Sequence, residues 1–206
     1  VVESLPIAQA SIAGLAQSMV GRQVHMGRVD TETREAGQAL LELKGVNVQD
    51  EMQVARLKDI ALTLRAGEIV GIAGVAGNGQ DELLGALSGE IKAPKGQVFL
   101  GGQDIGHLPP DARRMIGICA APEERMGHAA APDMSLTENA ALTARKRKNV
   151  TKNGFVNWGR ARSFAEEIIE RFDVRTPGPN NAARSLSGGN LQKFVIGREI
   201  LQDPKV

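Results

Sequence analysis

The stretch GIAGVAGNGQDELLGALSG, residues 71–89, contains glycines at the spacing of a phosphate-binding loop. Gly74 and Gly79 match the pattern G-x-x-x-x-G-K-[ST], which follows a strand and opens a helix. In such a loop, backbone N–H groups converge on an anion at the N-terminus of the helix, and glycines allow the phosphates to approach closely. The sequence predicts that Gly74, Gly77, Asn78 and Gly79 form this backbone device.

The residues that follow Gly79 depart from the pattern. Gln80 stands at the lysine position and Asp81 at the hydroxyl position, followed by Glu82. A neutral hydrogen bond contributes about 1 kcal/mol against about 1.5–3 for a charge-assisted one, so we expect roughly tenfold weaker phosphate binding or more. Asp81 could ligate Mg²⁺, or it could cap the helix. This stretch alone is equally well interpreted as a strand-to-helix turn in which Asp81 and Glu82 complement the helix dipole.

A second glycine motif, in ARSLSGGNLQKFVIGREILQ, lies near the end of the chain. Its hydroxyl and its glycine N–H groups stand at the start of a predicted helix, where they could face a γ-phosphate held by another phosphate-binding loop. Taken alone, the motif is also compatible with a simple helix-capping turn. The candidate residues are Leu186, Ser187, Gly188, Gly189 and Asn190.

Together these stretches resemble the P-loop and the LSGGQ signature of ABC-type ATPases, with Asn190 in place of the usual glutamine. GVAGNGQDELLGALSG, APEER and LSGGNLQKFVIGREI narrow the resemblance to the second ATPase half of the double-ATPase subunits of simple-sugar and nucleoside importers, whose P-loop is typically altered. APEER, residues 121–125, occupies the position of the Q-loop. Its glutamine is missing, and Pro122 and Glu123 stand nearby.

The resemblance implies an α/β fold: a P-loop NTPase core with a β-rich N-terminal part and a helical subdomain. It implies an incomplete domain, because the family's next element after Val206 would be the Walker B strand with the Mg²⁺-binding Asp and catalytic Glu, followed by the switch His. We therefore expect no catalytic residue in this chain and no ATP hydrolysis by the isolated fragment. The expected boundaries are 1–24 for the tail of a preceding ATPase half, 25–38 for a linker, 39–134 for the P-loop core and β-subdomain, 135–185 for the helical subdomain and 186–206 for the signature helix.

The implied cofactors are ATP and Mg²⁺, and both are expected to bind weakly at this half's own P-loop. The implied partners are a first ATPase half on the same polypeptide, membrane-spanning permease subunits and, indirectly, a solute-binding protein, at the cytoplasmic face of the inner membrane. Two alternatives stay open: a docking or regulatory half that holds no nucleotide, and a soluble ABC-type ATPase that acts on nucleic acid. The formal net charge of +1 and the lack of aromatic-basic stripes disfavour nucleic acid as a partner.

The composition and the lack of certain segments limit the compartment and the kind of protein. The single cysteine, Cys119, allows no internal disulfide and suits a reducing compartment. No apolar run reaches the roughly 18–20 residues that a membrane span needs, and the N-terminal stretch does not read as a secretory signal. No aromatic residue stands near 50–54, where the resemblance implies an adenine-stacking side chain.

The pattern of apolar residues predicts the elements that position these motifs. We expect a strand buried on both faces at 68–74, directly before the loop. Ser135 and Glu138 have the spacing of a capping box. Other predicted strands are 39–48, 57–64, 96–102 and 116–121, and other predicted helices begin near 81, 108, 158 and 188.

Several remaining residues are interpreted as structural. The basic run RKRK, residues 145–148, could contact lipid headgroups or nucleic acid, but the near-neutral net charge and the lack of interleaved aromatic residues favour a solvated helix end. Trp158, the only tryptophan, reads as a packing anchor at the start of a helix. The three histidines lie outside the motifs and are expected to be solvated loop residues: His25, His107 and His128.

Overall fold

The structure, a computed structural model, describes Gly14 and residues 37–50 and 52–206. The chain divides into two compact units, Val1–Glu35 and Ala36–Val206, and the fold below is that of the second unit. Apart from Gly14, the predicted tail lies outside the described residues, as do His25 and the predicted linker up to residue 36. Among the described residues, none of the helices combines the length and apolar character needed to cross a bilayer.

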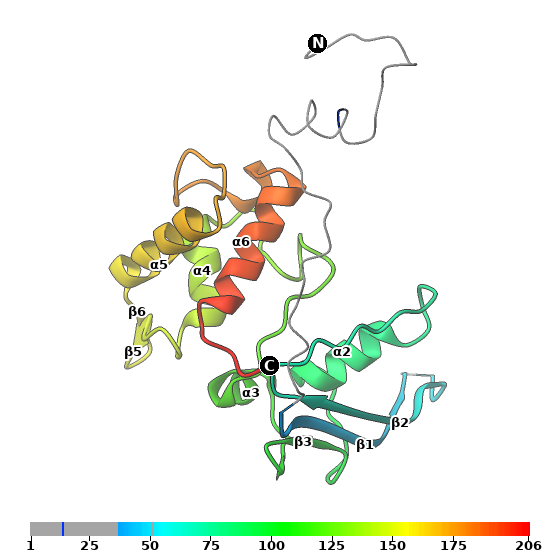
Figure 1. The fold of residues 1–206 in the computed structure, drawn as a ribbon. Helices are drawn as coiled ribbons and strands as arrows, with labels where there is room; N and C mark the ends of the chain where they lie inside the picture. Colours follow the sequence, from blue (N-terminus) through cyan, green and yellow to red (C-terminus); the bar gives the residue numbers. More distant parts are fainter. Residues whose placement is uncertain (1–13, 15–36, 51) are drawn as a thin grey trace. The chain divides into compact units, whose positions relative to one another are not determined.

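An antiparallel sheet forms the N-terminal part of this unit (Figure 1). Its strands lie in the order β2-β1-β3-β4 and span Ala39–Gln49 (β1), Ala55–Arg65 (β2), Val98–Leu100 (β3) and Gln103–Asp104 (β4). Side chains of β1 alternate into a core that also receives Leu83 and Ala86 from helix α2, Gln80–Ser88. The predicted strands at 39–48 and 57–64 are therefore confirmed, and 96–102 is confirmed for its central three residues.

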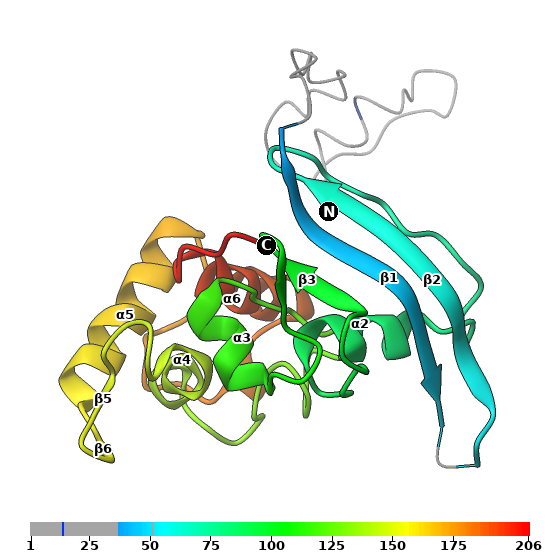
Figure 2. The same cartoon turned by 90° about the horizontal axis from the view of Figure 1, so that it is seen from below.

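Helices and a small hairpin make up the other part of the unit (Figure 2). Leu136, Phe164, Ile168, Leu191 and Phe194 form the centre of its core. The elements are α3 (Pro110–Ile116), α4 (Leu136–Ala144), β5 (Thr151–Lys152), β6 (Phe155–Val156), α5 (Trp158–Arg171), a 3₁₀ turn at Ala183–Ser185 and α6 (Gly188–Ile200).

The predicted capping box at the start of α4 is confirmed. The Glu138 N–H donates to Ser135 Oγ over 3.1 Å, and the Ser135 N–H donates to Glu138 Oε2 over 2.7 Å. These bonds satisfy donors that the first turn of a helix leaves unpaired. The Ser135 hydroxyl also donates to Glu138 Oε2 over 2.7 Å, and this bond, with that of the Ser135 N–H, holds the pKa of the Glu138 carboxyl below its usual range.

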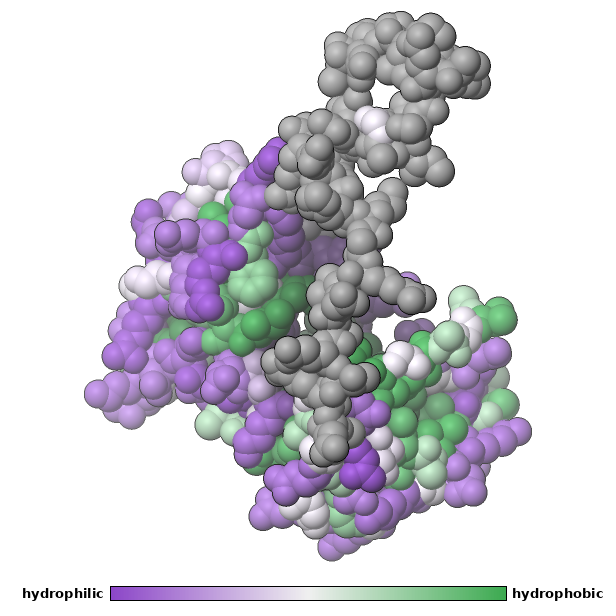
Figure 3. Space-filling view, in the orientation of Figure 1, coloured by the Kyte–Doolittle hydropathy of each residue, from purple (hydrophilic) through white to green (hydrophobic). Residues whose placement is uncertain are grey.

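The predicted strand at 68–74 is wrong for this structure. These residues form no strand, and Ile69 is 97% exposed and Ile72 54% exposed. A short apolar run becomes a strand only when neighbouring strands satisfy its backbone, and no described strand pairs with this one. Apolar surface, green in Figure 3, accordingly lies open beside α2.

Three smaller expectations are also corrected. Residues 116–121 form no strand, because Ile116 still belongs to α3 and Gly117 ends that helix in a left-handed conformation; backbone bonds to Lys205 and Val206 are the only pairing of this segment with the end of the described chain. Trp158 is 54% exposed and anchors no core. The basic run is not simply solvated, because Arg145 and Lys146 pair with Asp111 on α3.

Candidate functional site

The glycine loop meets α2 at Gly79, where two constraints require glycine. Its φ is 96°, in the left-handed region, and a Cβ there would lie 2.8 Å from Arg56 O on β2. Gly79 has no side chain that could cap the helix. No other described residue accepts a hydrogen bond from the N–H groups of Gln80 and Asp81. The start of α2 thus offers the uncapped donors that an anion site needs.

Gln80 folds back into the loop. Its Nε2 donates to Val75 O over 3.1 Å, and its Oε1 accepts from the Asn78 N–H over 3.1 Å. A Cβ on Gly74 would overlap the Gln80 amide, so that side chain packs directly over the glycine. The sequence suggested that Gln80 would donate to an outer phosphate. In the structure its amide instead fills part of the loop, and a phosphate must displace it.

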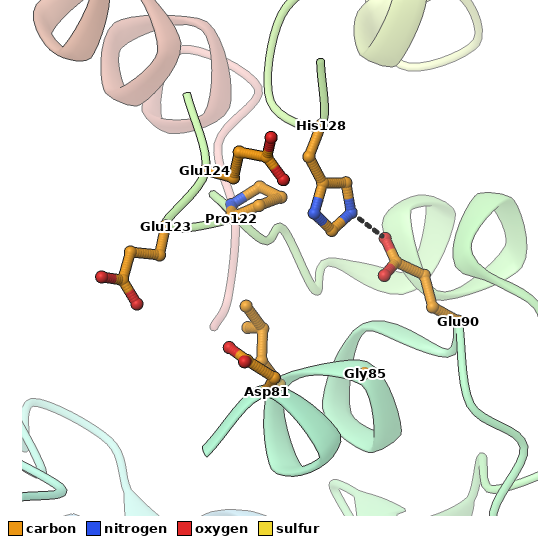
Figure 4. Close-up of a pocket in the computed structure, with 8 residues that line it drawn as sticks. Asp81, Gly85, Glu90, Pro122, Glu123, Glu124 and His128 are labelled. Atoms are coloured by element: carbon orange, nitrogen blue, oxygen red, sulfur yellow. Dashed lines mark hydrogen bonds and ion pairs between the residues drawn. The ribbon is translucent and has the colours of Figure 1, made fainter. Parts of the chain in front are cut away.

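An acidic hollow of about 440 Å³ lies beside the start of α2 (Figure 4). Asp81 enters it from α2, while Pro122 and Glu123 enter it from the APEER segment. The structure therefore brings the predicted phosphate loop and Q-loop regions together. The remaining polar lining is Glu90, Glu124 and His128, whose Nε2 lies 3.3 Å from Glu90 Oε1.

The negative charge of this hollow disfavours the binding of a polyphosphate. Its carboxylates would repel a phosphate tail unless a divalent cation lay between them. Within the described part of the chain, no three His, Cys, Asp or Glu side chains stand close enough together to hold a metal ion. Asp81 can therefore contribute one Mg²⁺ ligand here, and phosphate oxygens and water would have to supply the others.

The signature residues stand at the N-terminus of α6, which begins at Gly188. Ser187 is the N-cap, but its side chain makes no capping bond. Asn190 Nδ2 donates to Ser187 Oγ over 3.0 Å, which leaves the hydroxyl proton available. Ser187, Gly188 and Gly189 are exposed, whereas Leu186 is buried and anchors the motif in the helical core. The motif thus lies at the start of a helix, as the sequence predicts, and its serine side chain does not cap that helix.

Arg125 is a residue that the sequence analysis passed over. A Cβ built on Gly188 would lie 2.9 Å from Arg125 Nη1. Cα–Cβ bonds in a helix tilt toward its N-terminus, so the guanidinium lies at the N-terminal end of α6, beside the signature. Its presence in APEER was visible in the sequence, but only the fold brings it to the signature.

A buried charged network fixes α6 to its surroundings. Arg198, 1% exposed, donates to Asn139 O on α4 over 3.2 Å and to Ala129 O over 2.8 Å. Its Nε also donates to Glu199 Oε1 over 2.8 Å, and Glu199 in turn accepts from Arg114 on α3. Burial lowers the pKa of the Arg198 guanidinium, and Glu199 opposes that shift. The network links the signature helix to α3, to α4 and to the segment that follows APEER.

Comparison with known proteins agrees with these features. The sequence model of the ABC transporter family matches residues 57–206. The chain is 36% identical over 203 residues to the guanosine import ATP-binding protein NupO of Bacillus subtilis, covering 98% of this chain and 40% of that protein. It is 34% identical over 203 residues to the nucleoside import ATP-binding protein NupA of Lactococcus lactis, covering 98% of this chain and 40% of that protein. It is 36% identical over 205 residues to the glucose import ATP-binding protein TsgD13 of Haloferax volcanii, covering 98% of this chain and 37% of that protein. The chain thus spans well under half the length of these relatives.

Solved structures share the fold. A dimeric ATP-binding cassette bound to ADP and Pi superposes with a TM-score of 0.62 at 22% identity, covering 80% of this chain and 71% of that one. A nucleotide-free cassette from an ABC transporter superposes with a TM-score of 0.62 at 19% identity, covering 81% and 66%. The fold class predicted from the sequence is confirmed. The chain therefore belongs to the ABC transporter family, as an ATP-binding cassette with the P-loop NTPase fold.

Proposed function

We propose that this chain is part of the ATP-binding component of an importer for simple sugars or nucleosides, and that it presents its signature to ATP held on a partner cassette. One observation carries the proposal: Ser187 stands exposed at the start of α6 with its hydroxyl proton and the adjacent N–H groups unused. Relatives named as guanosine, nucleoside and glucose import proteins support the substrate class.

The proposed assembly is asymmetric. The relatives are more than twice as long as this chain, which is compatible with a first ATPase half on the same polypeptide. That half would hold ATP against Ser187, while this half's own loop, with Gln80 in place of lysine, would bind nucleotide weakly. Membrane-spanning permease subunits would complete the assembly at the cytoplasmic face of the inner membrane, and a solute-binding protein would deliver the solute.

A second function, a docking half that holds no nucleotide of its own, is favoured by the Gln80 side chain. Its amide occupies the loop with both polar groups satisfied, and the neighbouring hollow carries four carboxylates. Both features oppose a phosphate tail at this site. This function keeps the signature's role and removes only this half's own ATP site.

The affinity of the loop for Mg-ATP separates these two functions. We expect the chain to bind Mg-ATP with a dissociation constant above about 1 mM, and Gln80→Lys to bind it roughly tenfold more tightly, because lysine restores a charge-assisted contact. Isothermal titration calorimetry measures both values. Gln103→Lys adds the same charge on exposed β4 and should change nothing. Submillimolar binding by the unaltered chain would favour a retained site and overturn the docking-only function.

The chain by itself should not turn over ATP. The proposal gives it a signature without the partner loop that the signature serves, so a phosphate-release assay with Mg-ATP should give the rate of the buffer blank. When the partner half and the permease are added, reconstituted vesicles should show ATP-dependent solute uptake. Multiple turnovers by the chain alone, lost in Gly189→Asp, would contradict the division of roles.

A further inference from the structure

A short hairpin projects from the helical part of the protein, at the N-terminal end of α5 (Figures 1 and 2). Strands β5 and β6 pair antiparallel around Asn153 and Gly154, whose φ values of 52° and 83° fit the type I′ turn favoured by Asn-Gly. The base is fixed because the Asn157 N–H donates to Val150 O over 2.7 Å. Val150 is fully buried against Ala141 and Ala161. A firmly held base therefore carries an open tip.

The tip exposes apolar side chains. Phe155 is 81% exposed, Trp158 54% and Val156 36%, and every residue from 152 to 160 is exposed. No described residue covers these side chains, although burying a phenylalanine is worth about 1.5–3 kcal/mol. Phe155 shares its face of the hairpin with Lys152, and Val156 shares the other face with Thr151, so both faces of the tip carry exposed apolar surface. Exposed apolar side chains gathered on one projecting element are typical of contact surfaces.

The surroundings of the tip are strongly cationic. Between Arg145 and Ala165 the sequence has seven basic residues and no acidic one, whereas the whole chain has a formal net charge of only +1. Asp111 pairs with Arg145 and Lys146, and Glu166 pairs with Arg162. Within the described part of the chain, the other cations nearest the tip form no ion pair: Lys148, Lys152 and Arg160.

A shallow hollow of about 530 Å³ opens next to the tip. Lys148, Asn157, Arg160 and Ser163 line it with hydrogen-bond donors, and Lys148 Nζ lies 5.2 Å from the centre of the Phe164 ring that forms its apolar wall. Its one carboxylate, Glu167, is already paired with Arg171 over 3.2 Å. The hollow therefore offers positive charge and hydrogen-bond donors at Asn157, the residue between Val156 and Trp158.

We propose that the hairpin surface, formed by Phe155, Val156 and Trp158 with Lys148, Lys152 and Arg160, inserts into the headgroup region of an anionic phospholipid bilayer. Tryptophan and phenylalanine favour that interface, and lysine and arginine are drawn to its negative charge. Three apolar side chains on a projecting tip are too few for a specific protein interface, which needs about 800 Å² per partner. A fluid anionic surface requires no matching shape. The inference goes beyond the proposed function and is independent of either nucleotide motif.

Trp158 makes the inference directly measurable. It is the only tryptophan, and the chain has no tyrosine, so the emission of the 206-residue chain reports on this tip. With phosphatidylglycerol vesicles we expect a blue shift and quenching by lipids brominated on the acyl chains. With pure phosphatidylcholine vesicles we expect neither. High salt should reverse the binding because the attraction is electrostatic.

Substitutions then test which side chains carry the binding. Lys152→Gln with Arg160→Gln should lower the partition coefficient roughly 25-fold, about fivefold per cation. Phe155→Ser should lower it roughly tenfold, because a partly inserted ring is lost. The matched controls are Lys92→Gln with Lys95→Gln, which remove the same charge from exposed positions elsewhere, and Met115→Ser, which removes an exposed apolar side chain from α3.

Three results would overturn the inference. The first is an unchanged Trp158 emission spectrum in phosphatidylglycerol vesicles. The second is equal loss of binding in the hairpin variants and in their matched controls. The third is a blue shift that requires added permease protein, because the tip would then contact protein rather than lipid. Circular dichroism confirms that each variant keeps its fold, so weaker binding cannot be assigned to unfolding.

Discussion

Replacing Gly189 with aspartate should lower ATP turnover by the full-length protein, assembled with its membrane partners, by at least about 100-fold, the effect of losing one well-placed oxyanion donor. The new carboxylate would stand among the exposed N–H groups at the start of α6 and repel the γ-phosphate that they are proposed to hold. Phosphate release by the reconstituted transporter measures the loss.

The fold should tolerate this change. A Cβ on Gly189 would meet no atom within 4 Å, and the backbone there is not in the left-handed region. An acidic residue in the first turn of a helix also complements its dipole, so the thermal unfolding temperature should stay the same or rise slightly. Activity and stability are thus expected to move independently, which identifies a functional role for Gly189.

A second glycine provides the control. Gly178 also has open space around its missing Cβ and no left-handed conformation, so Gly178→Asp adds the same charge on the surface without touching α6. It should leave turnover unchanged. If both Gly189→Asp and Gly178→Asp kept normal ATP turnover, the signature would have no part in hydrolysis and the proposed function would fail.

Local patterns predicted the parts of this protein that local interactions determine. The capping box at Ser135 formed as predicted because its bonds join residues three apart. Gly79 was identified from its five-residue spacing to Gly74, and the structure places it at the left-handed start of α2, where glycine is required. Leu186 to Gly189 form a short continuous motif, and the helix predicted to begin near Gly188 does begin there. These features need no knowledge of the rest of the chain.

Features that depend on distant partners were predicted poorly. Residues 68–74 have the composition of a buried strand, yet strand formation depends on neighbours that no described element supplies. Trp158 was assigned to the core from its type alone, whereas its exposure depends on the hairpin beside it. Asn153-Gly154 was a readable turn signal that could have revealed that hairpin. The positions of Gln80 and Arg125 depend on three-dimensional contacts that no spacing encodes.

Removing the Arg198 side chain should cost the protein about 3–5 kcal/mol of unfolding free energy, the combined effect of a cavity and an unpaired buried acceptor. Arg198→Ala would leave Ala129 O without its donor in a buried site and open a cavity between α6 and α4. Glu199 would still be partnered by Arg114, so the loss comes chiefly from the unpaired carbonyl and the cavity. Urea unfolding followed by circular dichroism measures the change.

Two variants separate these contributions and test the network as the anchor of the signature helix. Arg198→Met fills most of the cavity but donates no hydrogen bond, so it should cost about 1–3 kcal/mol, the cost of an unpaired buried acceptor. Arg162→Ala, which removes an exposed i,i+4 pair with Glu166, should change the unfolding free energy by less than about 0.5 kcal/mol. Equal, small effects for Arg198→Ala and Arg162→Ala would show that the buried network contributes little. The expected order, with Arg198→Ala worst and Arg162→Ala nearly neutral, would show that contacts near the C-terminal end of α6 contribute much of the stability that holds the signature helix in the fold.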